Sequence, residues 1–509
     1  MTFLDHLVMA PVVVPAVAAP LTLLAMRRRR RVGVAMSLIG CVAMLAAALA
    51  LFATTQDGAI RVYPLGNWPA PFGIVLVLDR LAAIMLVLAS VLALIVMGHA
   101  VVTTADRKGW HFHPLFHFQL LGLNGAFLTG DLFNLFVFFE VLLIASYGLM
   151  LHGQGAARLK AGVAYVVVNI VGSALFLIAL GLLYTVTGTL NMADLSRKIA
   201  ALGPADAGMI RTAGLLLMAV FALKAAVVPL HLWLPRTYAA TMPVVGALFA
   251  IMTKVGVYAM IRVVPLMFGE GAGAAAWVPS PWLLPAAVLT AILGFGGVLA
   301  ARGLREGAAF AVLGSTGTLL LAVSGWTEAA TGAAIFYLFH ATLAGAALFL
   351  VADVALRRRG RYGDAAVPTP RFAGQAGVGL LYLGAAVAAV GLPPLSGFVG
   401  KLLILNTTFG AAWWGVIWAT ILVTTLIGVI GFSRSGSAIF WKVADARADP
   451  ITAPARSPAE FVAPAALLML LGALTLGAGP ASEQARATAA QLFAPERYTG
   501  VVLAGEEQR

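Results

Sequence analysis

The sequence is poor in charged residues and nearly free of cysteine. Only 10% of its 509 residues are charged, whereas 61% are hydrophobic, and the mean hydropathy is +0.97. A soluble protein of this length needs far more charge to cover its surface. The single cysteine, Cys41, lies in an apolar run, which excludes a disulfide framework and a cysteine-based metal site.

The chain also lacks the motifs of most cofactor-dependent enzymes. It has no Walker loop, no dinucleotide-binding fingerprint and no ligand set for haem or an iron–sulfur cluster. We therefore expect no bound cofactor, no metal and no enzymatic activity from this chain. Any energy that it uses must come from an ion gradient or from a partner protein.

Long hydrophobic runs, in contrast, are abundant. Runs of about 20 apolar residues recur from end to end, and each is long enough to cross the hydrocarbon core of a bilayer. We predict an all-α polytopic membrane protein with about fourteen transmembrane helices. The expected spans lie near residues 4–26, 32–54, 74–103, 112–129, 131–151, 161–187, 209–231, 241–266, 280–300, 306–325, 329–355, 373–408, 411–433 and 460–480. The loop 434–459 and the tail 481–509 are expected to be surface or partner-binding segments.

Basic residues are distributed unevenly between the connections. Those after odd-numbered spans hold most of them: Arg27 to Arg31, Arg107, Lys108, Arg158, Lys160, Arg236, Arg302, Arg305, Arg357 to Arg359, Arg361, Arg434, Lys442, Arg447 and Arg456. Connections after even-numbered spans hold mainly Arg61, Arg197, Lys198 and Arg211. The positive-inside rule then predicts that the odd connections are cytoplasmic and that both termini lie outside. Membrane orientation thus explains the net charge of +13 without a nucleic-acid partner.

Two predicted spans contain prolines that should break them. FALKAAVVPLHLWLP contains Pro229, and VGLPPLSGFVGKL contains Pro393 and Pro394. Proline lacks the backbone N–H and clashes with the preceding turn, so each span should split into half-helices. The breaks lie about 165 residues apart, which is compatible with two repeats of five helices in inverted orientation. Two unrelated proline kinks remain an alternative.

Lysine is scarce, and its positions are unusual. Only seven of the 33 basic residues are lysines, yet Lys224, Lys254 and Lys401 are the basic residues expected at mid-span. Arginine stays protonated in proteins, whereas a buried lysine can release its proton near neutral pH. We interpret these lysines as candidate proton carriers.

Two further titratable residues share this depth. His340 falls in the middle of AAIFYLFHATLAGAALFL and could relay protons between lysines; alternatively, it only bonds a backbone carbonyl between helices. Glu140 lies near the middle of FLTGDLFNLFVFFEVLLIASYGLM, and Lys224 is its expected partner. That pair could be a proton switch or a static clamp. With essentially one deep acidic residue, the chain is better suited to moving H⁺ than to coordinating Na⁺.

The other polar residues have simpler interpretations. Asp131 is expected at a helix N-terminus, where the helix dipole favours a carboxylate. Asp79 and Arg80 are adjacent near a span end and are expected to reach toward the interface. Arg262 and Asp353 are expected to lie close to interfaces. The cluster HFHPLFH has a spacing that could hold a metal, but nearby carboxylates are missing, so a metal site is not expected.

Four stretches carry a family resemblance: YPLGNWPAPFGIVLVLDRLAAIML, NGAFLTGDLFNLFVFFEVLLIASYGLMLHG, FALKAAVVPLHLWLPRTYAAT and GLPPLSGFVGKLLIL. They resemble the antiporter-like subunits shared by Mrp-type multisubunit cation/proton antiporters and respiratory complex I. The first two are most similar to the D-type subunits of the Mrp group. The resemblance covers about residues 1–480.

The resemblance implies fourteen helices, with inverted repeats in helices 4–8 and 9–13 and breaks in helices 7 and 12. It implies a proton pathway through Glu140, Lys224, Lys254, His340 and Lys401. It divides the chain into 1–103 (three helices), 112–266 and 280–433 (the repeats), and 434–509 (loop, last helix and tail). The expected location is the bacterial inner membrane, in contact with membrane lipid.

The expected function is proton translocation in a Na⁺/H⁺ antiporter, with Mrp subunits A, B, C, E, F and G as partners and H⁺ and Na⁺ as transported ions. One alternative is a proton-pumping subunit of a complex I-like or hydrogenase-linked assembly. Another is a scaffold subunit that transports nothing.

Overall fold

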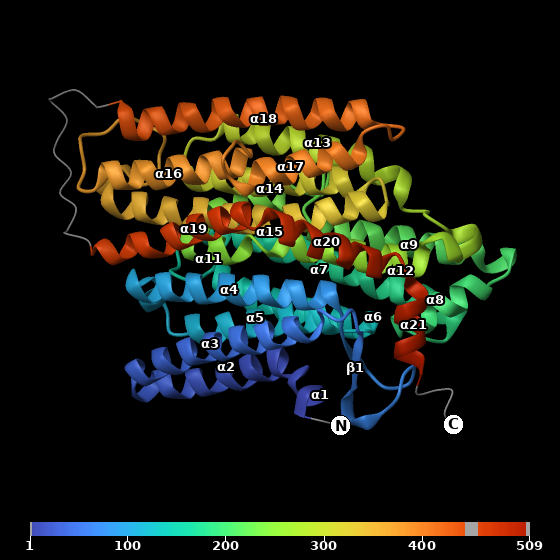
Figure 1. The fold of residues 1–509 in the computed structure, drawn as a ribbon. Coiled ribbons are helices and arrows are strands. Elements are labelled where there is room, and N and C mark those ends of the chain that lie inside the picture. Colours follow the sequence, from blue (N-terminus) through green and yellow to red (C-terminus); the bar gives the residue numbers. More distant parts are fainter. Residues whose placement is uncertain (1–2, 443–456, 505–509) are drawn as a thin grey trace.

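The chain folds into a bundle of helices that lie roughly side by side (Figure 1). The computed structural model describes residues 3–442 and 457–504. The N-terminal elements are α1 (Phe3–Leu7), α2 (Ala10–Arg28), α3 (Arg30–Thr54), β1 (Arg61–Pro64), β2 (Val75–Leu78) and α4 (Arg80–Val102). The next are α5 (Phe112–Leu128), α6 (Leu132–Met150), α7 (Ala156–Thr187), α8 (Met192–Ala201), α9 (Pro204–Lys224), α10 (Trp233–Ala240), α11 (Pro243–Phe249) and α12 (Met252–Phe268).

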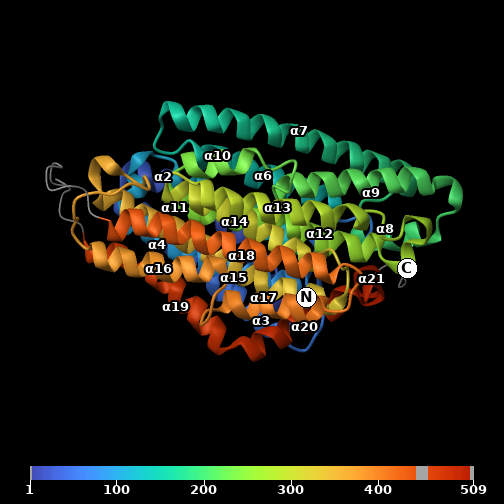
Figure 2. The same ribbon diagram turned by 90° about the horizontal axis from the view of Figure 1, so that it is seen from above.

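The second half of the chain continues the bundle. It contains α13 (Ser280–Ala300), α14 (Leu304–Val323), α15 (Glu328–Arg358), α16 (Gln375–Val390), α17 (Ser396–Thr408) and α18 (Trp414–Gly436). The C-terminal helices are α19 (Val462–Leu476), α20 (Ala478–Leu492) and α21 (Pro495–Leu503). Viewed from above, α7 runs along one edge of the bundle, and α10 lies beside its first half (Figure 2).

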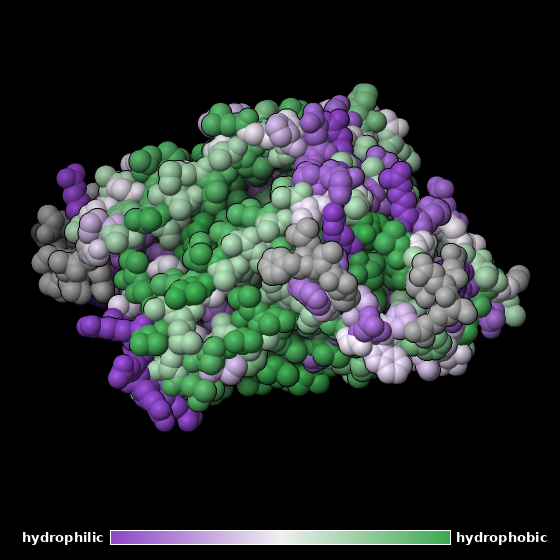
Figure 3. Space-filling model, turned by 60° about the horizontal axis from the view of Figure 1, so that its bottom comes forward, coloured by the Kyte–Doolittle hydropathy of each residue, from purple (hydrophilic) through white to green (hydrophobic). Residues whose placement is uncertain are grey.

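The predicted class, an all-α polytopic membrane protein, is confirmed. Within the described residues, twelve helical segments are long and apolar enough to cross a membrane. The two other predicted spans correspond to α5, which has 17 residues, and to the interrupted pair α16 and α17. The exact number of spans stays a prediction. Hydrophobic side chains cover a broad area of the visible surface, with hydrophilic ones gathered at its left end and in a band right of the centre (Figure 3).

Both predicted helix breaks are present. Helix α9 ends at Lys224, and α10 begins only at Trp233; α16 ends at Val390, and α17 begins at Ser396. A further interruption, which was not predicted, separates α11 from α12. Within residues 3–442 and 457–504, helical geometry is thus interrupted inside three of the predicted spans.

Two short backbone pairings occupy matching places in the two halves. Before α6, Leu132 N donates to Leu190 O, and Met192 N donates to Gly130 O, both at 2.9 Å. Before α14, Leu304 N donates to Asp364 O at 2.9 Å, and Ala366 N donates to Arg302 O at 2.8 Å. Each pairing joins the connection between the first two helices of a proposed repeat to the segment after its third helix. They support the predicted repeats, which nonetheless stay a prediction.

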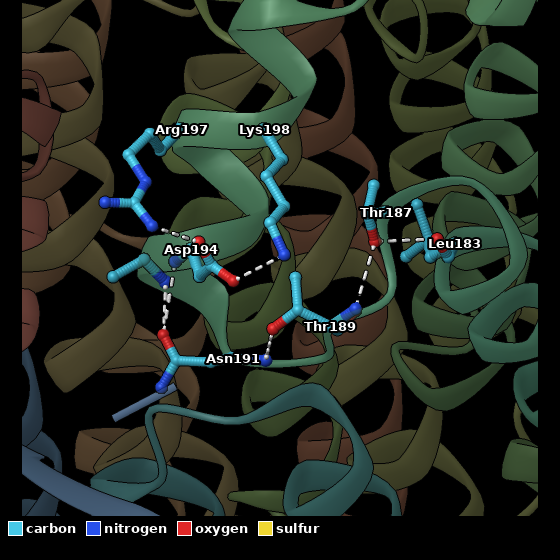
Figure 4. A network of polar contacts seen from close by, with 8 residues as sticks. Leu183, Thr187, Thr189, Asn191, Asp194, Arg197 and Lys198 are labelled. Carbon is cyan, nitrogen blue, oxygen red and sulfur yellow. Dashed lines mark hydrogen bonds and ion pairs between the residues drawn. The ribbon is translucent and has the colours of Figure 1, made fainter. Parts of the chain in front are cut away.

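Helix α8 was not predicted, and a polar network anchors it (Figure 4). Asn191 caps its N-terminus by accepting from Ala193 N at 3.0 Å. The buried Asp194 pairs with Arg197 at 2.9 Å and with Lys198 at 3.0 Å. Arg197 and Lys198, which lie in a connection predicted to hold few basic residues, thus share a carboxylate partner.

The C-terminal tail differs from the predicted surface segment. Helix α20 packs along α15, and α21 packs against α8. The side chain of Gln491 accepts from Arg80 N and donates to Gly58 O, both at 3.0 Å. The tail therefore covers the end of the bundle that holds β1 and α8. The first and last described residues lie toward this same end (Figure 1). The predicted basic residues Arg447 and Arg456 lie outside the described residues.

Candidate functional site

Lys224 ends α9 at the first break, in the interior of the bundle. Because Pro229 has no N–H, the carbonyl of Ala225 loses its usual helical partner and the helix cannot continue. The indole Nε1 of Trp233 donates to Leu223 O at 3.1 Å and so caps part of the interrupted turn. Lys224 thus sits at a helix C-terminus, where the helix dipole favours a positive charge.

Two side chains of α7 lie between Lys224 and Glu140. Lys224 Nζ donates to Asn169 Oδ1 at 3.4 Å. One turn later, the Ser173 hydroxyl donates to Glu140 Oε1. In the part of the chain that the structure describes, no ion pair joins Glu140 directly to Lys224. The two charges instead interact through space and through these intervening groups.

The surroundings of the two residues differ. Lys224 is 8% exposed, whereas Glu140 is half-buried on the outward side of α6. A cavity of about 20 Å³ borders Lys224, Asn169 and Trp233, which is room for about one water molecule. Glu140 is therefore placed near the edge of the subunit, and Lys224 lies inside it.

Lys254 lies just after the interruption between α11 and α12. It is fully buried, and its ammonium donates to Thr253, Ser315 and Thr316 hydroxyls at 3.2, 3.1 and 3.2 Å. Among the described residues it has no carboxylate partner. Hydroxyls both donate and accept hydrogen bonds, so the same three groups can solvate an ammonium or a neutral amine.

Helix α12 crosses α9 directly beside Lys224. A Cβ added to Gly256 would lie 2.5 Å from Ala225 N and 2.8 Å from Phe221 O. Only glycine therefore allows this close approach. The crossing brings Lys254 and Lys224 onto adjoining turns of two helices.

Lys401 fills the second break. Pro394 lacks an N–H, so Val390 O has no backbone donor four residues later. The Lys401 ammonium donates to Val390 O at 2.7 Å and to Thr425 Oγ1 at 2.6 Å. It also lies 5.3 Å from the centre of the Phe295 ring, an arrangement that stabilises a cation. The lysine side chain thus satisfies a carbonyl that the proline leaves free.

His340 on α15 points into the same break. Its Nε2 lies 3.0 Å from Ala388 O, and its Nδ1 lies 2.9 Å from Ser396 Oγ. Because a carbonyl only accepts, Nε2 carries a hydrogen, and the Ser396 hydroxyl donates to Nδ1 when the ring is neutral. Lys401 and Lys254 are the charged groups that act on His340 through space. The bond to a backbone carbonyl also matches the structural alternative for this residue.

Four of the five candidate residues thus form two pairs, and Lys254 has its own set of hydroxyl partners. Glu140 and Lys224 are connected through Ser173 and Asn169 on one face of α7, and His340 and Lys401 share the second break. Sequence reasoning missed the groups that connect them, among which Asn169, Ser173 and Thr316 are prominent. The sequence did contain a signal for two of them: Asn169 and Ser173 are polar residues four positions apart in an apolar run, a spacing that places both on one helix face.

The interpretation of Asp79 needs correction, because Asp79 pairs with Arg262. Both are buried, and they form an ion pair with two hydrogen bonds; one of them joins Arg262 Nη2 to Asp79 Oδ1 at 2.7 Å. The Asp79 side chain does not reach toward the interface, because Arg262 satisfies it inside the protein. Asp79 also caps α4 by accepting from Ala82 N at 2.9 Å. The prediction for Asp131 is confirmed, since it caps α6 by accepting from Asn134 N at 2.8 Å.

Two of the three histidines of HFHPLFH, His113 and His117, have separate partners. His113 lies 3.1 Å from Asp106 Oδ2, and His117 lies 3.0 Å from Ser37 Oγ. No group of three or more histidine, cysteine or acidic residues with metal-binding geometry occurs within residues 3–442 and 457–504.

Comparison with known proteins identifies the family. Residues 129–428 match the family model "NADH:quinone oxidoreductase/Mrp antiporter, TM". The chain belongs to this family. It is 40% identical to the D-type subunit of the probable K(+)/H(+) antiporter of Rhizobium meliloti, with 98% of each chain covered. It is 34% identical to the D-type subunit of the Na(+)/H(+) antiporter of Bacillus subtilis, covering 98% of this chain and 100% of that one.

Solved structures agree with this assignment. A chain of the Mrp complex from Dietzia sp. DQ12-45-1b superposes with a TM-score of 0.86 and 28% identity, covering 99% of this chain and 100% of the other. A chain of respiratory complex I from Thermus thermophilus superposes with a TM-score of 0.76 over 96% of this chain and 100% of that one. Its identity is 24%, so this second likeness concerns the fold alone.

Proposed function

We propose that this chain is the proton-translocating subunit of a multisubunit monovalent cation/proton antiporter. The observation that carries the proposal is the placement of Lys254 and Lys401, which are buried, have no carboxylate partner among the described residues and are surrounded by hydroxyl and carbonyl oxygens. A permanently charged structural lysine normally has a counter-ion at this depth. The curated relatives named as antiporter subunits support the same conclusion.

In the proposed mechanism, each carrier gains and loses a proton without losing its hydrogen-bond partners. Hydroxyl rotors around Lys254 reverse direction when the ammonium becomes an amine. At His340, the Ser396 hydroxyl accepts when Nδ1 is protonated and donates when it is not. A proton therefore passes from one of these carriers to the next without large movements of the helices that hold them.

In this proposal, the protonation state of Glu140 controls the protonation of Lys224. A charged Glu140 stabilises a protonated Lys224 through space, and a protonated Glu140 does not. The Ser173 and Asn169 side chains hold the two groups apart, so their interaction changes with protonation instead of locking into a permanent pair. This arrangement favours a switch over a static clamp.

We place the basic end of the bundle in the cytoplasm, because most of the arginines and lysines in the connections lie there. Both termini then lie on the outer side of a bacterial inner membrane. We also propose inverted repeats over helices 4–8 and 9–13, which the two matching backbone pairings support. Mrp subunits A, B, C, E, F and G are the proposed partners. The names of the relatives support this assembly over a complex I-like pump or a silent scaffold.

The test uses the complete antiporter in inverted membrane vesicles. Glu140→Gln and Lys224→Ala should abolish the change in ΔpH that follows addition of Na⁺ or K⁺, while assembly of the complex, checked by co-purification of the other subunits, stays normal. Comparing the two cations also decides which one is exchanged. Full activity of either variant in an assembled complex would contradict the proposal.

A further inference from the structure

A wide groove opens on the basic end of the bundle, outside the proposed proton pathway. It has a volume of about 1130 Å³ and lies between the start of α7, helix α10 and the start of α14. Its walls include Ala161, Ala164 and Val168 from α7, and Leu232 and Phe310 from the other two sides. The three elements adjoin connections that we assign to the cytoplasmic side, so the groove lies at the depth of lipid head groups.

The groove carries an excess of positive charge. Arg158, Lys160, Arg236 and Arg305 line it, with Glu306 as its acidic residue. Arg305 is paired with Asp364 outside the groove lining, at 2.9 Å. The other three cations have no ion pair within the described residues. Such a concentration of unpaired charge beside an apolar wall needs an anionic partner with an apolar part.

The charged groups are also held in place. Arg158 Nε donates to Ala240 O at 3.1 Å, and its Nη1 donates to Gln154 O at 2.7 Å. These bonds fix the guanidinium between α7 and α10 without neutralising it. A fixed guanidinium recognises phosphate better than a flexible one, because less side-chain freedom is lost on binding.

The opposite face of α7 is apolar as well. Leu159, Val163, Val167 and Ile170 are each more than half exposed. Their spacing places them on one side of the helix. This stripe faces away from the groove, so the acyl chains of a lipid bound in the groove lie against its own wall of Ala161, Ala164 and Val168.

We propose that this groove binds an anionic glycerophospholipid, such as phosphatidylglycerol, through its phosphate. Arg158, Lys160 and Arg236 contact the phosphate, and the acyl chains lie against α7. Trp233 borders both this groove and the small cavity at Lys224, so the bound lipid packs against the half-helix that follows the first break. Charge complementarity favours a lipid over a partner subunit, because the groove combines unpaired cations with aliphatic walls at membrane depth.

The test measures lipid binding by the intact complex and does not depend on transport. The complex is placed in phosphatidylethanolamine vesicles that contain a trace of photoactivatable phosphatidylglycerol, and cross-linked peptides are mapped by mass spectrometry. The triple variant R158Q/K160Q/R236Q should need about a hundredfold more phosphatidylglycerol for equal labelling of the groove. The matched control R28Q/R29Q/R31Q removes the same charge from exposed arginines at the same end and should label normally.

A second variant removes no charge. Ala164→Phe fills the groove from an exposed helical position and should also reduce labelling, which keeps the test decisive if the triple variant fails to assemble. Equal labelling of wild type and Ala164→Phe would overturn the proposal. So would capture of another subunit, instead of lipid, by a photo-cross-linker placed at Leu232, because a protein would then occupy the groove.

Discussion

Gly397 offers a sharp test of the second break, because a single methyl group there would collide with three groups. A Cβ at this position would lie 2.6 Å from His340 Nε2, 2.7 Å from Ala388 O and 2.8 Å from the Cα of Gly391. Ordinary contacts begin at 3.4 Å, so the first overlap is about 0.8 Å. Two of the three groups belong to the backbone and cannot simply rotate away.

The consequence of Gly397→Ala follows from these distances. Moving α17 away from α16 costs about 1–3 kcal/mol in repacking, and loss of the bond from His340 to Ala388 adds about 1 kcal/mol. The displacement of His340 should lower transport about tenfold or more, since shifts near 1 Å are costly for aligned groups.

The assay measures cation-dependent ΔpH in vesicles together with the Tm of the purified complex. Gly415→Ala is the matched control, because nothing lies within 4 Å of the corresponding Cβ on the adjacent helix α18. Gly397→Ala should lower both transport activity and Tm, and Gly415→Ala should leave both unchanged. Normal transport and normal Tm for Gly397→Ala would refute the described geometry of the break.

Two ion pairs give further predictions. Arg262→Leu should lower the stability of the complex by about 3–5 kcal/mol, because it leaves the buried Asp79 carboxylate without its cationic partner. R262L combined with Asp79→Leu should recover part of the lost Tm, and no recovery would contradict this account. At Asp364, burial alone would raise the pKa, but hydrogen bonds and the charge of Arg305 outweigh it, so the pKa lies below its ordinary value. The pair therefore stabilises the protein at neutral pH and loses this effect as the pH falls through that lowered pKa. The difference in Tm between wild type and Arg305→Gln should accordingly be largest near pH 7 and shrink below about pH 4; a difference independent of pH would contradict the assignment.

Much of the architecture was predictable from the sequence for clear physical reasons. Spans of apolar residues have few alternatives in a bilayer, because their backbone groups must be satisfied within the segment. The breaks at Pro229 and Pro394 were predictable because proline removes a specific hydrogen bond. Helix α8 was not, since a short amphipathic segment resembles a polar loop when its contacts are unknown. The packing of the tail on α15 was missed for the same reason.

The candidate site was predictable only at its charged positions. Charge at bilayer depth is conspicuous, which singled out Glu140 and Lys254. The partners of these residues are hydroxyls, amides and freed carbonyls, and such groups are common in any membrane helix. The sequence therefore predicted a direct pair between Glu140 and Lys224. In the structure, Asn169 and Ser173 lie between these two residues. Which neutral groups face a buried charge depends on helix rotation, and no pattern in a single helix reveals that.

Lys254 provides the most direct test of the proton pathway. Lys254→Arg keeps a positive charge among the same hydroxyls but introduces a group that does not release its proton. The decisive measurement is cation-dependent ΔpH in vesicles that contain the assembled complex with this substitution. The account predicts normal assembly and loss of transport, because the charge is present and the exchangeable proton is not. Transport at the wild-type rate would contradict it and would assign Lys254 a purely structural role.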